Sequence, residues 1–331
     1  MTISLTIANA RALAEAAFMR LGFDATETKM VVGHLIDAEL RGLRYAGFGR
    51  LVSIAEQIRK RGKSQRPIAI VRETCLSASL DGGDQLGLIV AQRATELAIA
   101  KTETSGIAVV GANNTWYTGM LSYYGEQLAE RNIVALIASN ATARVAAYGG
   151  TEPRIGANPI CFAFPSAEHP VVWDIGTSAI GHAQVMLASR LGKPLEPGLA
   201  FDSDGQPTTD PFAALAGAFA SWGGHRGSGL GIVVQLLGML AGSPALPGEL
   251  RDFGFLIVGV RPDLLTSLKA FKKAVAEYSA VIRATRPVKD GAPLRMPFDR
   301  SRANRDANIA RDSIELQDTI YASIKAIAAE P

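Results

Sequence analysis

The segment Gly-Gly-His-Arg-Gly-Ser-Gly-Leu-Gly at residues 223–231 runs directly into the apolar segment Ile232–Leu240. The apolar run predicts a buried helix, and the glycine-rich turn marks where that helix begins. The first N–H groups of a helix have no partner inside it and the helix dipole is positive there, so such a turn can bind an anion. Arg226 adds a planar cation that suits a phosphate group. The segment therefore predicts a phosphate site.

The same glycines have a plainer interpretation, in which they only let the helix pack closely against its neighbours. The chain has no Gly-x-Gly-x-x-Gly after a strand and no Gly-x-x-x-x-Gly-Lys-Ser/Thr segment. Because both common nucleotide-binding motifs are missing, the motif alone leaves phosphate binding and close packing about equally supported.

Composition excludes several classes of protein. A net charge of +3, with the basic residues scattered, gives no reason to expect nucleic acid or an anionic membrane surface as partner. The two cysteines lie far apart, and no histidines, cysteines or carboxylates stand at metal-ligand spacing, so neither a disulfide framework nor a metal site is expected. No signal-like or membrane-spanning segment is seen, and the cytoplasm is the expected location.

Hydrophobic periodicity predicts helices at both ends of the chain and strands between them. Helical spacing covers Ile7–Leu21 and Thr26–Leu43, and it returns over residues 267–279 and 304–328, so the tail is expected to close over the N-terminal helices. Short apolar runs bounded by Gly, Asn or Pro predict the strands, which are Ile107–Val110, Ile133–Ile137, Ile160–Phe164, Val171–Trp173 and Phe255–Gly259. Helices are expected near Leu86–Ala100 and Tyr123–Glu130, and Pro211 should open another. The fold class is therefore α/β or α+β with a covered sheet.

Several segments together resemble one family over nearly the whole chain. In order they are Arg41-Gly42 to Arg50, Asn114–Tyr124, Asn140, Gly149-Gly150, Gly156-Ala157-Asn158-Pro159, Asp174–Ala183, Asp202–Pro211, Gly223–Gly229 and Pro297–Arg300. Their order and spacing are similar to the malate/L-lactate dehydrogenase family, which includes sulfolactate, ureidoglycolate and diketogulonate dehydrogenases and Δ1-piperideine-2-carboxylate reductase. The stretches Thr177–His182 and Gly223–His225 look most like the piperideine/pyrroline-carboxylate reductase branch.

The resemblance implies a non-Rossmann NAD(P)-binding fold of the L-sulfolactate dehydrogenase-like type, with a central mixed sheet and a helical lobe built from both chain ends. On this basis we expect a helical scaffold domain at residues 1–115 with 275–331, and an NAD(P)-binding sheet domain at residues 116–274. The implied cofactor is NADP or NAD, and the implied assembly is a homodimer. The implied cofactor-binding residues are Asp174, Ile175, Gly176, Thr177, Ser178, His182, His225, Arg226, Phe298, Asp299 and Arg300.

The implied substrate is a small carboxylate, for which hydride transfer needs a cation to hold the carboxylate and a proton donor for the reacting group. Arg50 stands at the arginine position that follows the family's Ser-His-Gly element, so it is the expected anchor. Where the family has Ser-His-Gly this chain has Tyr45-Ala46-Gly47, so the usual histidine acid is absent. A second family histidine has become Trp116-Tyr117, and a family threonine has become Ala157. The expected substrate-binding residues are Trp116, Thr118, Gly119, Met120 and Ala157.

Three explanations of the missing histidine stay open. Tyr45 or Tyr117 could donate the proton, so with Arg50 they form the predicted catalytic set. The substrate could be a cyclic imine that carries its own proton. The pocket could have lost catalysis and kept dinucleotide binding. The sequence thus predicts an NAD(P)-dependent oxidoreductase acting on a 2-oxo, 2-hydroxy or cyclic 2-imino carboxylate, with a non-catalytic dinucleotide-binding protein as the alternative.

Overall fold

The computed structural model describes residues 2–329, apart from the side chains of residues 190 and 191. The chain forms two compact units. Unit 1 contains residues 2–65, 164–172 and 266–329, and unit 2 contains residues 66–163 and 173–265. Residues 66–115, which the family resemblance placed with the helical domain, belong to the sheet-bearing unit 2.

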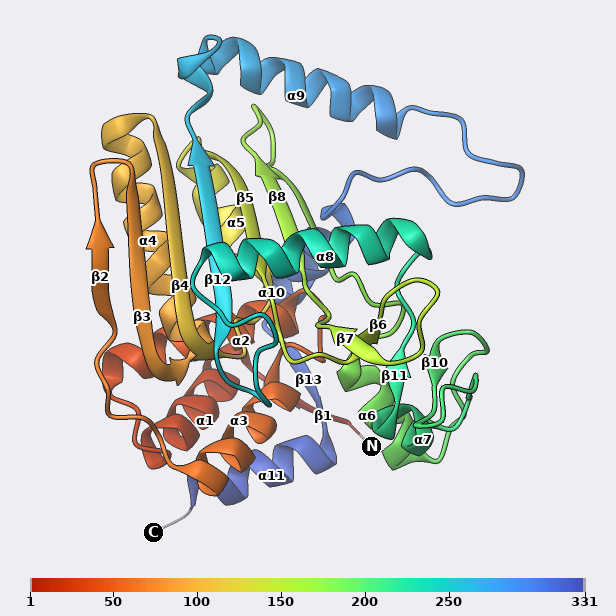
Figure 1. Cartoon of the computed structure of the whole chain (residues 1–331). Coiled ribbons are helices and arrows are strands. Elements are labelled where there is room, and N and C mark those ends of the chain that lie inside the picture. Colours follow the sequence, from red (N-terminus) through yellow and green to blue (C-terminus); the bar gives the residue numbers. More distant parts are fainter. Residues whose placement is uncertain (1, 330–331) are drawn as a thin grey trace. The chain divides into compact units, whose positions relative to one another are not determined.

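Unit 2 is built on a mixed sheet of seven strands, as the expected fold class requires. Its strand order is β2 (Ala69–Glu73), β3 (Ser77–Leu86), β4 (Ile107–Trp116), β12 (Phe253–Val260), β5 (Val134–Ser139), β8 (Ile160–Phe164) and β9 (Val171–Ile175). Strands β3 and β4 are parallel, whereas β12 is antiparallel to both β4 and β5. Helices α4 (Gly87–Ser105) and α5 (Leu121–Glu130) cover one face and α8 (His225–Leu240) covers the other (Figure 1).

Unit 2 also holds a small four-stranded sheet, in the order β10 (Ala200–Phe201), β11 (Ala218–Phe219), β6 (Val145–Ala146) and β7 (Pro153–Ile155). Helices α6 (His182–Leu191) and α7 (Pro211–Ala216) pack on it around Val145, Val185 and Phe219. Asp210 caps α7 and Pro211 occupies its first turn, which confirms the predicted helix start. A short 3₁₀ helix, η1, spans Pro262–Leu264.

The prediction that Ile232–Leu240 forms a buried helix is wrong in part, because α8 is buried on one face only. Val234 is fully buried and packs with Leu230 and Leu237 against the sheet. The opposite face exposes Ile232 (46%), Val233 (48%), Leu236 (56%) and Leu240 (71%). A helix that is apolar all round is expected to be covered on all sides. A single chain leaves this face uncovered.

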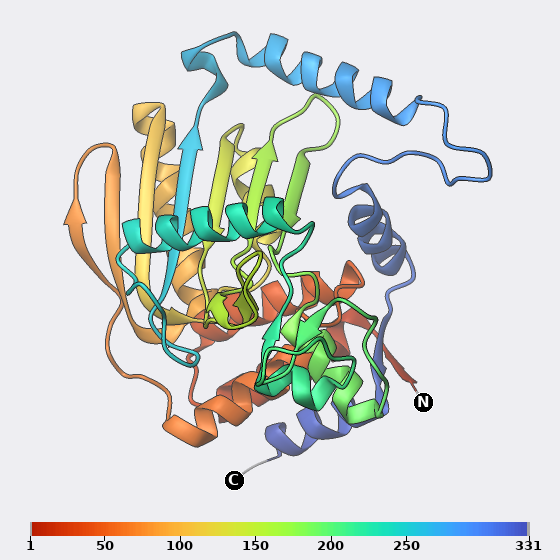
Figure 2. The ribbon, with the colours of Figure 1, turned by 45° about the vertical axis from the view of Figure 1, so that its right-hand side comes forward.

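Unit 1 is mainly helical and joins the two ends of the chain, as predicted. Its helices are α1 (Ile7–Arg20), α2 (Ala25–Leu40), α3 (Phe48–Arg61), α9 (Leu268–Arg283), α10 (Asp299–Ala310) and α11 (Asp318–Ala328). Strand β1 (Thr2–Leu5) pairs antiparallel with β13 (Ile314–Gln317), and Figure 2 shows these two end segments side by side. The helical pattern predicted over 304–328 is therefore interrupted by β13, whose alternating burial at Ile314 and Leu316 is the signature of a strand.

None of the helices in the described part of the chain combines the length and hydropathy needed to cross a membrane.

Candidate functional site

The first turn of α8 has the geometry of an anion site. Its N-cap is Gly224, so no side chain caps the helix. Gly223 and Gly224 adopt φ values of 59° and 64°, a left-handed conformation that favours glycine. His225 and Arg226 follow at the first two helical positions, and both are exposed. The positive end of the helix dipole and a guanidinium are thus presented on one accessible turn.

Both interpretations of the glycine-rich segment apply, but to different glycines. A Cβ at Gly227 would collide with the Trp222 carbonyl oxygen, and a Cβ at Gly231 would lie only 2.9 Å from the Thr177 hydroxyl oxygen. These two glycines serve close packing. Gly223 and Gly229 have open space around a would-be Cβ, so close packing does not explain them.

The loop that follows β9 lies against this turn. Trp222 N–H donates to the Thr177 carbonyl at 2.9 Å, and Ser178 forms a β-bridge with Ser221. Thr177 is buried, and its hydroxyl donates to the Ala157 carbonyl at 3.2 Å. Unit 2 therefore places the predicted cofactor segment 174–178 against residues 221–222, which lead directly into His225 and Arg226, and the Ala157 carbonyl holds Thr177 in place.

Asp174 accepts a hydrogen bond from the first turn of α5. Its Oδ2 accepts the N–H of Ser122 at 2.8 Å. Burial raises the pKa of Asp174, and the hydrogen bonds from Ser122 and the Leu121 backbone oppose that rise. Its contact with a cofactor stays a prediction. Beside it, Ile175 lies in the cluster that packs under α8, and Gly176 is exposed.

The remaining predicted residues of unit 2 divide into buried and accessible ones. Trp116 is buried, and its Nε1 donates to the Asp84 carbonyl at 3.2 Å. Thr118 is buried and donates to Ser139 Oγ at 3.0 Å.

Tyr117 is half-buried with a φ of 52°, a strained conformation for a bulky residue and one that is over-represented at functional sites. Met120 is buried, Gly119 is exposed, and half-buried His182 begins α6 beside Phe219. Their contacts with substrate or cofactor stay predictions.

In unit 1, Arg50 lies in the first turn of α3, where its N–H donates to the Gly47 carbonyl at 2.8 Å. That turn holds no acidic residue. Glu39, which was not predicted from the sequence, is a buried carboxylate of α2. Its Oε1 accepts the Phe48 N–H at 2.5 Å and so caps α3. Burial raises the pKa of Glu39 to about 7, against the lowering effects of the Phe48 hydrogen bond and the charge of Arg44. Glu39 therefore fixes the turn that carries Arg50.

The residues around the missing histidine differ in exposure. Tyr45 is 55% exposed, whereas Ala46 is buried. A Cβ at Gly47 would collide with the Glu39 carboxylate, so Gly47 and Glu39 fit each other. Residue type and spacing gave no signal for Glu39, because its role depends on the tertiary contact between α2 and the start of α3.

The C-terminal turn lies in unit 1 and packs on the segment that leads to Arg50. Phe298, at a φ of 75°, places its ring 4.4 Å from the Arg41 guanidinium carbon. Arg41 is buried and pairs with Asp37 at 2.6 Å. Asp299 accepts both Nε–H and Nη2–H of Arg283, which lowers the pKa of Asp299. Arg300 is exposed, so it is the residue of this turn whose side chain is most accessible to a ligand.

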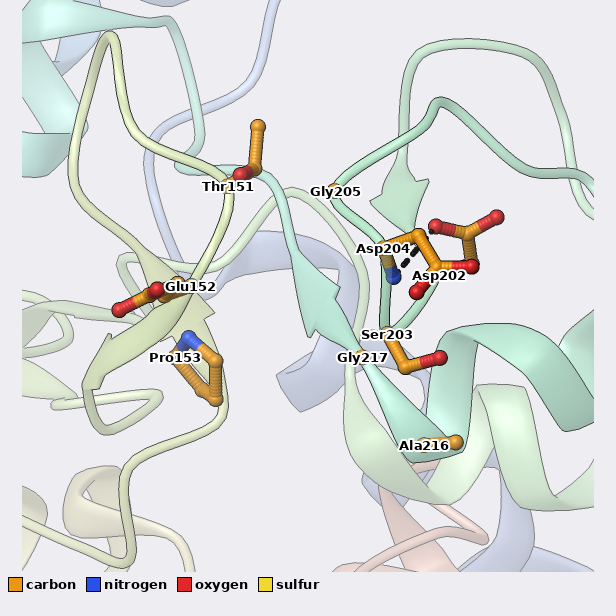
Figure 3. Close-up of a pocket in the computed structure, with 9 residues that line it drawn as sticks. All are labelled: Thr151, Glu152, Pro153, Asp202, Ser203, Asp204, Gly205, Ala216 and Gly217. Atoms are coloured by element: carbon orange, nitrogen blue, oxygen red, sulfur yellow. Dashed lines mark hydrogen bonds between the residues drawn. The ribbon is translucent and has the colours of Figure 1, made fainter.

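A separate hollow of unit 2 does not suit an anionic ligand. Figure 3 shows Glu152, Asp202 and Asp204 around it, in a cavity of about 180 Å³. Asp202 Oδ1 accepts the backbone N–H groups of Asp204 and Gln206, which makes it a turn-forming residue. Among residues 2–329, no group of three or more His, Cys, Asp or Glu side chains could hold a metal ion. The carboxylates at this hollow would repel phosphates and carboxylates alike.

The fold defines an α/β protein in which helix α8 begins at an uncapped glycine turn, and comparison with known proteins gives its family. The family model for malate/L-lactate dehydrogenase matches residues 5–325. The (2R)-3-sulfolactate dehydrogenase (NADP(+)) of Chromohalobacter salexigens is 30% identical over 99% of both chains. The Δ1-pyrroline-2-carboxylate/Δ1-piperideine-2-carboxylate reductase of Pseudomonas putida is 34% identical over 69% of this chain and 67% of its own length. The crystal structure of a dehydrogenase from Sinorhizobium meliloti superposes with a TM-score of 0.92 at 31% identity, over 99% of both chains. This chain belongs to the malate/L-lactate dehydrogenase family and is an oxidoreductase.

Proposed function

We propose that this chain is an NAD(P)-dependent oxidoreductase that transfers a hydride between nicotinamide and a small carboxylate with a 2-oxo, 2-hydroxy or cyclic 2-imino group. The observation that carries the proposal is the uncapped first turn of α8 with exposed His225 and Arg226, which fits a pyrophosphate. The bound nicotinamide supplies or accepts the hydride. Relatives named as dehydrogenases of sulfolactate and as a reductase of cyclic imino acids support both substrate types.

The chain's own residues bind the ligands and supply the proton. The α8 turn with Arg226 binds the pyrophosphate, and Arg50 binds the substrate carboxylate. A 2-oxo acid needs a proton for the developing alkoxide, which Tyr45 or Tyr117 supplies. A protonated cyclic imine already carries its proton, so replacement of the histidine by Ala46 does not slow the reduction of such a substrate.

Oxidation of NADH and of NADPH by the purified protein tests the proposal, with open-chain 2-oxo acids and Δ1-piperideine-2-carboxylate as paired substrates. Turnover of the imine alone assigns the chain to imino-acid reduction. Turnover of 2-oxo acids requires a substitute proton donor. Cofactor binding without turnover of any of these substrates would support a non-catalytic protein and contradict the proposal.

The two tyrosines give a prediction that depends on the substrate. With a 2-oxo acid, one of Tyr45→Phe and Tyr117→Phe is expected to lower kcat by about 100-fold, the usual size of a general-acid effect. With a cyclic imine, neither change should lower kcat by more than about threefold, because no acid is needed. Steady-state kinetics and pH–rate profiles on both substrates check this. A 2-oxo acid activity that neither variant changes would exclude both tyrosines as the acid.

The exposed face of α8 indicates how the chain assembles. We infer a homodimer in which a second copy covers Ile232, Val233, Leu236 and Leu240, because contiguous apolar patches on a surface mark interaction sites. Leu236→Asp is expected to convert the dimer into a monomer of 35.0 kDa. Leu265→Asp, at the exposed leucine that directly follows η1, is the matched control and should stay dimeric. Light scattering after gel filtration gives the masses, and a dimeric Leu236→Asp variant would contradict this interface.

A further inference from the structure

Tyr148 is an exposed aromatic residue beside the first turn of α8. The proposed function gives this residue no role. It lies between β6 and β7, and 69% of its surface is exposed. Large aromatic side chains are normally buried, because each removes a large apolar area from water. An exposed aromatic ring next to a candidate ligand site therefore indicates that the ring contacts the ligand.

The backbone fixes this ring against the start of α8. Tyr148 N–H donates to Ser228 Oγ at 2.9 Å. The Tyr148 ring lies edge-on to the His225 ring, with centroids 6.0 Å apart. Its Cε2 would be 3.4 Å from a Cβ at Gly224. The ring is thus adjacent to the first turn of α8, where the proposed function puts the pyrophosphate.

The loop that carries Tyr148 is tied to the same turn at a second point. Ser221 Oγ donates to the Ala146 carbonyl at 2.7 Å, two residues before Tyr148. Gly150 N–H donates to the Ala147 carbonyl at 2.9 Å, which closes a tight turn around Tyr148. The backbone that carries the ring is therefore held in place without a ligand, and preorganisation of this kind lowers the entropy cost of binding.

We propose that Tyr148 is the platform on which the adenine ring of the dinucleotide stacks, an inference that rests on the proposed function. One ribose separates each base of the dinucleotide from the pyrophosphate, so an aromatic ring beside the pyrophosphate site can meet a base. The nicotinamide needs a slot closed to water for hydride transfer, whereas adenine does not react and can lie on an exposed ring. Stacking of a base on an aromatic side chain contributes about 1–3 kcal/mol.

A truncated cofactor shows whether Tyr148 binds the adenine half or the nicotinamide half of the dinucleotide. The dissociation constants of NADH, NADPH and reduced nicotinamide mononucleotide, which lacks the adenosine half, are measured by calorimetry. Tyr148→Ala is expected to raise Kd for a dinucleotide by about tenfold and to change Kd for the mononucleotide by less than about twofold. Tyr148→Phe keeps the ring and should bind like the parent protein. Tyr278→Ala, at a tyrosine of α9 that is 62% exposed, is the matched control and should also bind normally.

Each outcome decides a separate point. Unchanged dinucleotide binding by Tyr148→Ala would overturn the stacking role and leave the proposed function intact. An equal loss for the mononucleotide would place Tyr148 on the nicotinamide half and would also overturn the proposal. A parent protein that binds neither NADH nor NADPH would overturn the proposed function together with this inference.

Discussion

Arg50→Ala is expected to lower kcat/KM for the carboxylate substrate by about 100-fold or more, while NAD(P)H binding stays unchanged. Charge-assisted hydrogen bonds from a bidentate arginine to a carboxylate contribute about 3 kcal/mol, and the arginine also orients the reacting carbon. The start of α3 makes Arg50 suited to this role. Glu39 caps the helix through Phe48 N–H and so positions the turn that carries Arg50.

Two further variants and two checks of the folded state separate loss of the carboxylate anchor from a general loss of structure. Arg50→Lys keeps the charge and loses the planar fork, so its kcat/KM should lie between those of the parent and the alanine variant. Lys60→Ala removes an exposed cation from the same helix and should leave kcat/KM within about threefold of the parent. Circular dichroism and the Kd of NADH check that the fold and the cofactor site persist. An Arg50→Ala enzyme with parental kcat/KM would show that the carboxylate binds elsewhere.

The sequence predicted those parts of the fold that local patterns determine. The strand predicted at Ile160–Phe164 and the helix start at Pro211 agree with the structure to the residue, because turn formers bound the first and proline marks the second. Strand β13 was missed because Ile314–Gln317 is four residues long and stands between two helices. Its strand conformation depends on pairing with β1, more than 300 residues away in the chain, and no local window contains that partner.

The candidate site was predicted less completely, because burial is a tertiary property. The glycine-rich turn and Arg226 could be recognised from residue type alone. Apolar composition made α8 look buried, since a sequence cannot distinguish a side covered by the sheet from a side that a single chain leaves open. Tyr148 gave no signal for a related reason. Its relevance comes from its ring contact with His225, 77 positions further along the chain.

Glu39→Gln is expected to stabilise the protein above pH 7, in contrast to the usual destabilising effect of substitution at a buried polar residue. Burial raises the pKa of Glu39 to about 7 from a reference value of 4.5, so the folded protein retains a proton that the unfolded chain releases. The stability that this carboxyl group contributes is therefore full below pH 4.5 and is lost as pH rises through 7. One pKa unit corresponds to about 1.4 kcal/mol, so the loss is about 3 kcal/mol. Glutamine stays neutral and its amide oxygen can still accept the Phe48 N–H.

His34 acts in the opposite direction over an overlapping range of pH. Burial lowers the pKa of His34 to about 3, so the folded protein keeps the imidazole neutral, and the stability this contributes is lost as pH falls below 6.5. The two effects partly cancel in the parent protein between pH 4.5 and 6.5. In Glu39→Gln only the His34 effect remains, so the stability of this variant should rise with pH across that range.

Urea unfolding of the parent and of Glu39→Gln at pH 5, 6, 7 and 8 measures the difference directly. The free energy of unfolding of the variant minus that of the parent should grow by about 3 kcal/mol from low to high pH, because His34 contributes equally to both proteins. Glu56→Gln, at an exposed glutamate of α3, is the control and should give a difference that does not change with pH. A difference for Glu39→Gln that is equally flat would mean that the carboxylate is solvated in solution, and that it caps α3 in its ionised form at neutral pH.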